Sequence, residues 1–163
     1  RKIIEGATFV THALPGIVIG ISMVFVGVNA LRPIYLEAPL LILAYVVLFI
    51  PLAVASLRAA LDQIPKTLDE VARSLGSSPI GVLRRVSFPL VLPSVGAAVA
   101  LITLAAMKEL PVTMLLHPTG VDTIATRLWT YTSVSDYAAA GPYALAMLLF
   151  VAVPTALASR SGK

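Results

Sequence analysis

Four long stretches of the chain contain no Asp, Glu, Lys or Arg. They cover 26, 20, 22 and 23 residues, at positions 6–31, 38–57, 86–107 and 137–159. A helix needs roughly 20 apolar residues to cross the hydrocarbon core of a bilayer, and each stretch reaches that length. The pattern predicts an all-α integral membrane protein, with four transmembrane helices in a single transmembrane domain.

The overall composition points the same way. Of the 163 residues, 58% are hydrophobic and 12% are charged, whereas roughly a quarter of a soluble domain is charged. These figures exclude a disordered chain, a fibrous repeat and an ordinary cytosolic enzyme domain. A net charge of +4 on so apolar a chain is typical of positive loops on a membrane protein. We therefore expect contact with membrane lipid and no nucleic-acid partner.

Residues that would support catalysis are scarce. The sequence has no cysteine, and its two histidines, His12 and His117, are far apart. No cluster has the spacing of metal ligands, and no Gly-rich phosphate loop follows a strand pattern. We expect no enzyme activity, no catalytic residue, no metal site and no cofactor.

Basic residues are distributed unevenly between the segments that connect the four stretches. Nine lie at the two ends of the chain or between the second and third stretches, and three lie in the other two connections: Arg32, Lys108 and Arg127. The positive-inside rule then places both ends and the 58–85 connection in the cytoplasm. The 32–37 turn and the 108–136 segment are expected to face outward.

The cytoplasmic connection has the pattern of a helix-turn-helix hairpin over residues 62–88. Thr67 and Glu70 have the spacing of a capping box, in which each side chain bonds the other's backbone amide. An apolar face follows over positions 68–75. Gly76 then stands where a helix needs a left-handed residue to stop.

A second short helix is expected after this corner. Ser78 can cap its first turn, and Pro79 fits the first helical position. Apolar residues then recur at helical spacing toward the third stretch. The pattern leaves two roles open for the hairpin. It could rest on anionic headgroups, or it could dock a cytoplasmic partner.

The order of residues in the hairpin resembles the EAA signature of binding-protein-dependent ABC importer permeases. That signature is Glu-Ala-Ala, three residues, Gly, nine residues, Ile, any residue and Leu-Pro. The chain has Glu70-Val71-Ala72, Gly76 and Val86-Ser87-Phe88-Pro89 at the same spacing, with conservative departures at Val71, Val86 and Phe88. The resemblance implies that the ATPase-coupling residues are Glu70, Val71, Ala72, Leu75, Gly76, Pro79, Val86, Phe88 and Pro89.

The resemblance also implies partners and a location. In this family the permease hydrolyses nothing, and a cytoplasmic ATP-binding subunit moves the hairpin as it closes on ATP. A periplasmic or extracellular substrate-binding protein delivers the substrate. The remaining permease half, or a second permease subunit, completes the path in the bacterial inner membrane. Because the chain begins at Arg1 rather than Met, we expect it to be the C-terminal part of a longer permease with both ends in the cytoplasm.

The segment after the third stretch suggests a substrate. Its sequence is similar to the ferric-iron type permeases in three runs: Lys108-Glu109-Leu110-Pro111, Leu115-Leu116-His117-Pro118 and Asp122-Thr123-Ile124-Ala125-Thr126-Arg127. This likeness implies ferric iron, but relatives that move thiamine, phosphonates or polyamines look similar here. Two other classes remain open: a fragment of a secondary transporter or channel, and a membrane scaffold that recruits a cytoplasmic partner.

Candidate residues for a translocation path lie on the third stretch and just after it. Gly96, Ala100, Thr103 and Met107 recur on one helix face, which could line a path or form a close-packed seam. Lys108 and Glu109 follow near the outer end. An ionisable pair inside the membrane would be a functional candidate, whereas a pair at a helix end commonly snorkels to the interface.

Smaller features concern packing near the outer face. In the first stretch Gly16, Gly20 and Gly27 lie roughly on one face, where small residues let helices approach closely. The apolar run 110–116 is expected to dip back into the membrane or to pack on helix ends. Asp122 is expected to cap a short outer helix, which would meet the binding protein or lie in the interface.

Overall fold

The structure of the protein is a computed structural model, and it describes residues 15–161. All regular secondary structure in this part of the chain is helical. Helix α3 (Ala38–Asp62) and the continuous helix Pro79–Met107, which ends in α6 (Phe88–Met107), are long and apolar enough to cross a membrane. Shorter apolar segments occur in α2 (Gly16–Asn29) and in α9 (Tyr137–Ser161). These features fit the predicted all-α integral membrane protein.

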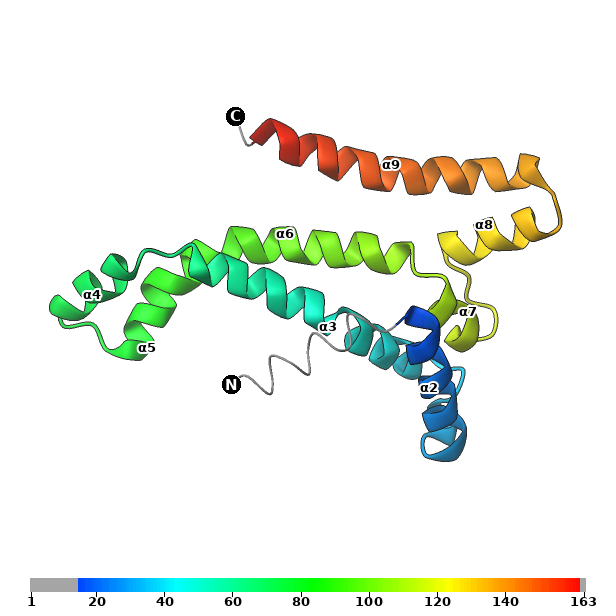
Figure 1. Cartoon of the computed structure of the whole chain (residues 1–163), viewed down its shortest axis with the longest axis horizontal. Coiled ribbons are helices and arrows are strands. Elements are labelled where there is room, and N and C mark those ends of the chain that lie inside the picture. Colours follow the sequence, from blue (N-terminus) through cyan, green and yellow to red (C-terminus); the bar gives the residue numbers. More distant parts are fainter. Residues whose placement is uncertain (1–14, 162–163) are drawn as a thin grey trace.

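Helices α3 and α6 pack on each other and form the long axis of the molecule, and they diverge toward the end that carries α7 (Figure 1). The hairpin lies at one end of this pair and contains α4 (Lys66–Ser74), α5 (Pro79–Val82) and a π-helical turn (Leu83–Ser87). Two short helices lie at the other end, α7 (Pro111–Leu116) and α8 (Ile124–Ser133). The 3-10 turn η1 (Arg32–Ile34) connects α2 to α3, and α9 packs mainly on α8.

The predicted stretches correspond to helices with shifted ends. Helix α3 extends past residue 57 to Asp62, because charged side chains are tolerated where a helix leaves the apolar core of the bilayer. The third stretch begins inside a helix that starts at Pro79. Residues 6–14 of the first stretch, which include His12, lie outside the described residues, as do Arg1, Lys2 and Lys163.

The most buried apolar side chains lie where α7 meets α2 and α3. Leu40 and Ala44 of α3 and Val112 and Leu116 of α7 form a core with no exposed surface. Partly buried hydrophobic side chains of α2 and of the α2–α3 connection pack against this core. Helix α7, which contains most of the apolar run 110–116, packs against α2 and α3.

The glycines of α2 are points of close helix approach, as their spacing predicts. A Cβ atom added at Gly20 would lie 2.7 Å from Leu115 Cδ1 and 3.4 Å from the Val112 backbone. One added at Gly27 would lie 2.7 Å from side-chain atoms of both Leu40 and Tyr35. Glycine at these two positions is what lets α7 and α3 approach α2 so closely.

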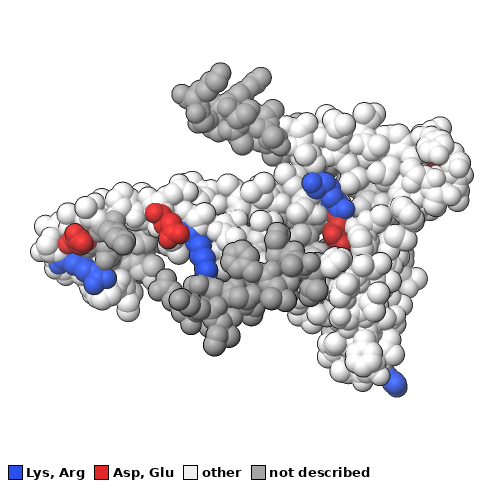
Figure 2. All heavy atoms as spheres, in the orientation of Figure 1, with Lys and Arg blue, Asp and Glu red and all other residues white. Residues whose placement is uncertain are grey.

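Much of the remaining helix surface is apolar and uncovered. Figure 2 shows the Lys, Arg, Asp and Glu side chains of one face in a few small groups, with uncharged surface between them. Large exposed apolar side chains occur along α6 and α9, among them Leu92, Val99, Leu101, Leu145 and Leu148. A surface of this kind is expected where a helix contacts lipid or another membrane subunit.

Candidate functional sites: a hairpin and an apolar groove

The first helix of the hairpin begins two residues earlier than its sequence suggests. Helix α4 starts at Lys66 after Pro65, which is extended, and no side chain caps this end. The predicted capping box is therefore wrong, because Thr67 and Glu70 both lie inside the helix. Proline has a fixed φ and no N–H, so it fits just before a first helical turn but not within a helix. Pro65 thus sets the start of α4.

The corner after α4 has the predicted left-handed glycine. Gly76 has φ +82°, and its N–H donates to the Arg73 carbonyl at 2.9 Å. The N–H of Ser77 donates to the Ala72 carbonyl at 3.0 Å, which completes a Schellman motif. A Cβ added at Gly76 would meet no atom within 4 Å, so the corner is open toward its surroundings.

The second arm of the hairpin runs without a break into α6. The Ser78 hydroxyl accepts a hydrogen bond from the Gly81 N–H at 3.1 Å, and Pro79 occupies the first turn, as predicted. The helix then passes through the π-helical turn, where the Phe88 N–H donates to the Leu83 carbonyl. Pro89 has no N–H for the ladder, which accounts for an irregular turn at this point. Movement of the hairpin is thereby connected to a membrane helix.

The tip of the hairpin presents apolar side chains. Leu75 is 80% exposed and Ile80 is 77% exposed, the highest values among the large apolar residues of the described chain. Val82 is buried, and Ala72 and Val86 are half-buried. The other predicted coupling residues are exposed: Glu70, Val71, Pro79, Phe88 and Pro89. The helical pattern identified Leu75 but missed Ile80, whose only signal is its place beside the corner.

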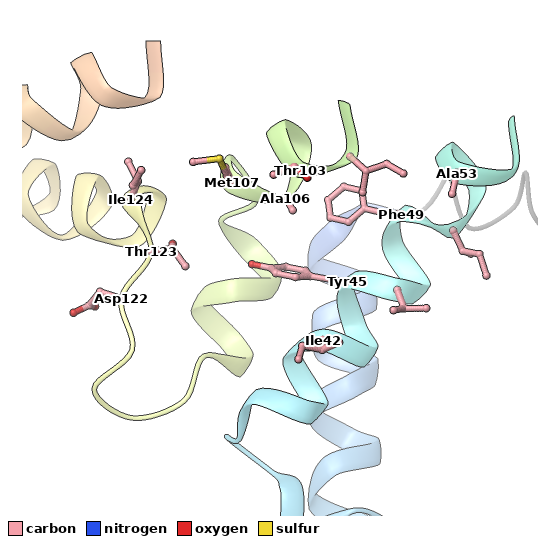
Figure 3. Close-up of a pocket in the computed structure, with 13 residues that line it drawn as sticks. Ile42, Tyr45, Phe49, Ala53, Thr103, Ala106, Met107, Asp122, Thr123 and Ile124 are labelled. Atoms are coloured by element: carbon pink, nitrogen blue, oxygen red, sulfur yellow. The ribbon is translucent and has the colours of Figure 1, made fainter. Parts of the chain in front are cut away.

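An apolar groove of about 740 Å³ lies between α3, α6 and the segment that leads into α8 (Figure 3). We call it the α3/α6 groove. Its lining residues are Ile42, Tyr45, Val46, Phe49, Ile50, Ala53, Ile102, Thr103, Ala106, Met107, Asp122, Thr123 and Ile124. Asp122 is the single acidic residue among them. The groove therefore offers an apolar surface with a few hydroxyl groups and one carboxylate near an end.

The predicted path residues are not all in one place. Thr103 and Met107 line the α3/α6 groove, whereas Gly96 and Ala100 are not among its lining residues. An added Cβ at Gly96 would meet no atom within 4 Å, so no neighbour within the described chain packs there. Lys108 lines a smaller cavity of about 280 Å³ beside Trp129 and Met147.

The segment before α8 is stabilised differently from the prediction. Thr123, not Asp122, is the N-cap of α8, and it exchanges hydrogen bonds with Thr126 in a capping box. A threonine pair at N-cap and N3 can bond both free amides, which leaves Asp122 available for another partner. The Asp122 carboxylate pairs with Arg127 at 2.7 Å, and this contact raises the pKa of the guanidinium above its ordinary value.

Among residues 15–161, no three His, Asp or Glu side chains come close enough together to hold a metal ion. Glu109 is not among the residues that line either cavity, and it accepts a hydrogen bond from the Val112 N–H at 3.0 Å. Its carboxylate thus caps α7. The described residues carry two features that could act in transport. One is the apolar hairpin tip, at one end of the α3–α6 pair (Figure 1). The other is the α3/α6 groove, which is lined by residues 42–53 of α3, 102–107 of α6 and 122–124.

Comparison with known proteins identifies the family. Residues 1–162 match the family described as binding-protein-dependent transport system inner membrane component. The chain belongs to this family. The family is one of transport permeases rather than catalytic enzymes, and the hairpin is the segment of this chain that carries the EAA-like residues.

Individual relatives have more specific names. The chain is 38% identical over 154 residues to the Fe(3+)-transport system permease protein FbpB 2 of Haemophilus influenzae. The matched region covers 94% of this chain and 30% of the relative. It is 35% identical over 105 residues to the 2-aminoethylphosphonate transport system permease protein PhnU of Salmonella typhi. This match covers 64% of the chain and 36% of the relative. For PhnV of Salmonella typhimurium the identity is 27% over 140 residues. The matched region covers 85% of this chain and 52% of the relative. The chain spans about half or less of each of these relatives.

Proposed function

We propose that this permease is the membrane-embedded subunit of an ATP-driven importer for ferric iron. The relative that is 38% identical over 94% of the chain is named as an Fe(3+)-transport system permease protein, and the segment 108–127 resembles that group. A second candidate substrate is 2-aminoethylphosphonate, because PhnU and PhnV are also similar at lower identity.

The hairpin is the observation that carries the proposal. Its tip exposes Leu75 and Ile80, and burying an apolar side chain of this size stabilises a complex by about 1.5–3 kcal/mol. The tip enters a groove on a cytoplasmic ATP-binding subunit, which carries out the ATP hydrolysis. Because α5 continues into α6, closure of that subunit tilts a membrane helix that lines the α3/α6 groove.

The proposed topology has four membrane spans and cytoplasmic ends in the bacterial inner membrane. The positions of the hairpin and of α7 and α8, at opposite ends of the α3–α6 pair (Figure 1), support this topology. A substrate-binding protein delivers its cargo to the face that carries α7 and α8. The α3/α6 groove is open on one side, and the remaining permease half or a second permease subunit closes it into a path.

Selectivity resides mainly in the substrate-binding protein. The α3/α6 groove has a single acidic side chain, Asp122, and this carboxylate is already paired with Arg127. Ferric iron is a hard cation that is held by several oxygen ligands. A groove with one engaged carboxylate lets the cation pass without holding it tightly, as a path must.

Uptake measurements on the intact transporter test the substrate. A strain that lacks the gene is supplied with labelled ferric iron, 2-aminoethylphosphonate or thiamine, with and without a plasmid copy of the gene. We expect the deletion to abolish iron uptake at limiting concentration and the plasmid to restore it. Normal iron uptake together with lost phosphonate uptake would transfer the proposal to the second substrate. Normal uptake of all three would reject both.

A further inference from the structure

Glu109 occupies an unusual position between three helices. It follows α6, and its Oε1 atom accepts a hydrogen bond from the Val112 N–H at 3.0 Å, which caps α7. A Cβ added at Gly16, the first residue of α2, would lie 3.0 Å from the same oxygen. The carboxylate therefore lies against the start of α2. A side chain at position 16 would occupy part of the space that the carboxylate fills. The first amides of both helices carry partial positive charge, which favours an anion here.

A chain of hydrogen bonds leads from the backbone of Glu109, through the Thr113 side chain of α7, to the α3/α6 groove. The Thr113 hydroxyl donates to the Glu109 carbonyl at 2.7 Å. Since this uses its only proton, Thr113 accepts at its oxygen from the Tyr45 hydroxyl. Thr113 is completely buried. Tyr45 lines the α3/α6 groove, and Figure 3 shows its ring beside the space between α3 and α6.

We propose that Glu109 is a positioning residue for translocation. Its carboxylate holds α7 in place between α2 and α3, and α7 in turn fixes the Tyr45 ring in the wall of the α3/α6 groove. Glu109 acts from outside the groove and does not bind the cargo there. This inference rests on the proposed function, because it takes the α3/α6 groove as part of the translocation path.

A positioning role and a cargo-binding role for Glu109 make different demands on its charge. Glutamine keeps an oxygen that can accept from the Val112 N–H, but it removes the negative charge. Alanine removes both. If Glu109 positions α7, Glu109→Gln restores most of what Glu109→Ala loses. If Glu109 binds a cation, the two substitutions are equally damaging.

The test combines uptake with the reactivity of a thiol in the groove. The 163 residues contain no cysteine, so Thr103→Cys introduces a thiol at a lining position. The assembled transporter in membrane vesicles is treated with a water-soluble maleimide. The labelling rate of this thiol is measured in three forms of the Thr103→Cys protein: with Glu109 unchanged, with Glu109→Gln and with Glu109→Ala. Uptake of the labelled substrate is measured in the same variants without the added cysteine. No substrate is present during labelling.

We expect Glu109→Ala to change the labelling rate several-fold and to lower uptake by about fivefold, the factor that corresponds to a typical helix-cap loss. Glu109→Gln should match the unmodified protein in both measurements. Gly16→Ala should act like Glu109→Ala but more weakly. Gly141→Ala is the matched control, since an added Cβ there meets no atom within 4 Å, and it should change neither measurement.

Three results would overturn the inference. Equal loss of uptake in Glu109→Gln and Glu109→Ala would indicate that the charge itself acts on the cargo. An unchanged labelling rate in Glu109→Ala would separate Glu109 from the groove. A lower amount of protein, with normal labelling and uptake per molecule, would leave only a role in stability. Failure of the proposed function would give a different result. The unmodified protein would then show no uptake of the substrate, while the labelling rates of the variants would still differ as expected.

Discussion

The hydroxyl of Tyr45 in α3 bonds the hydroxyl of Thr113 in α7, although 68 residues separate them in the chain. Thr113 is completely buried beside the apolar side chains of Val112 and Leu116. Buried hydroxyls are costly unless they are paired. This bond therefore specifies one register of α7 against α3, which apolar packing alone would leave less strictly defined.

Replacing Thr113 should expose the cost of that pairing. Thr113→Val keeps the shape of the side chain but leaves the Tyr45 hydroxyl and the Glu109 carbonyl without this partner, at a cost of about 1–3 kcal/mol in unfolding free energy. Thr113→Ser keeps the hydroxyl and should cost less. Denaturant unfolding in detergent micelles measures both. In the double variant with Tyr45→Phe the effects should not add; additive losses would mean that the bond contributes nothing.

The end of α8 offers a stabilising substitution. Ser135 has φ +61°, and the N–H groups of Ser135 and Asp136 donate to the Thr132 and Tyr131 carbonyls at 3.1 and 2.9 Å. This is a Schellman motif with a non-glycine residue in the left-handed position, which costs roughly 1–2 kcal/mol. Ser135→Gly should raise the thermal midpoint. Ser133→Gly, at the last residue of α8, should lower the thermal midpoint, because it removes the hydroxyl that donates to the Thr130 carbonyl. A rise in both variants would contradict this prediction.

Local sequence signals predicted the hairpin well where they depend on backbone conformation. Gly76 and Ser78 each fulfil a requirement that few residues meet, a positive φ and an N-cap oxygen, so their positions could be assigned from the sequence. Thr67 and Glu70 also match a capping pattern, yet Pro65 determines where α4 starts. A side-chain pattern is permissive, whereas a proline constrains the backbone directly.

The groove and the Glu109 contacts could not be predicted in the same way. Gly96, Ala100, Thr103 and Met107 share a helix face, but the groove depends on where α3 lies against that face. Thr103 and Met107 line it and the other two do not. Likewise, the glycine at position 16 indicates a close approach without naming Glu109 as the neighbour. Such long-range partners depend on the packing of α7, for which a short apolar run gives no unique solution.

The proposed membrane topology can be tested with single cysteines. Ser77 lies in the hairpin and Ser133 near the end of α8, at opposite ends of the α3–α6 pair (Figure 1). In right-side-out vesicles, an impermeant maleimide should label Ser133→Cys and not Ser77→Cys. Inverted vesicles should give the reverse result. Labelling of both positions from one side would contradict the four-span topology.

Two hairpin substitutions separate the cap observed in the structure from the one suggested by the sequence. Ser78→Ala removes the oxygen that accepts from the Gly81 N–H, a loss of about 1 kcal/mol in local stability. Thr67→Ala should have little effect, because Thr67 lies inside α4 and caps nothing. Amide hydrogen exchange of the intact protein measures this local stability. Exchange at the Gly81 amide is expected to be faster in Ser78→Ala and unchanged in Thr67→Ala. Faster exchange of the Glu70 amide in Thr67→Ala would restore the predicted capping box.

The sharpest test of coupling is a bulky residue at the glycine corner. Gly76→Val forces a β-branched residue to φ +82°, at a cost of roughly 1–2 kcal/mol, and it adds bulk where the open corner meets a partner. Since the membrane helices do not pack on this corner, expression should stay near normal while uptake is lost. Co-purification of the ATP-binding subunit, and its ATP turnover, show whether docking or coupling has failed.

A matched variant separates coupling from backbone strain. Gly120 has φ +81°, and an added Cβ there also meets no atom within 4 Å, but it lies in the segment between α7 and α8, far from the hairpin. Gly120→Val therefore imposes the same strain and should leave binding of the ATP-binding subunit intact. Glu70→Ala, on the exposed surface of α4, should weaken that binding less than Gly76→Val does. If Gly76→Val transported at the full rate, the hairpin would be a headgroup-resting element, and the coupling role would have to be assigned to another segment.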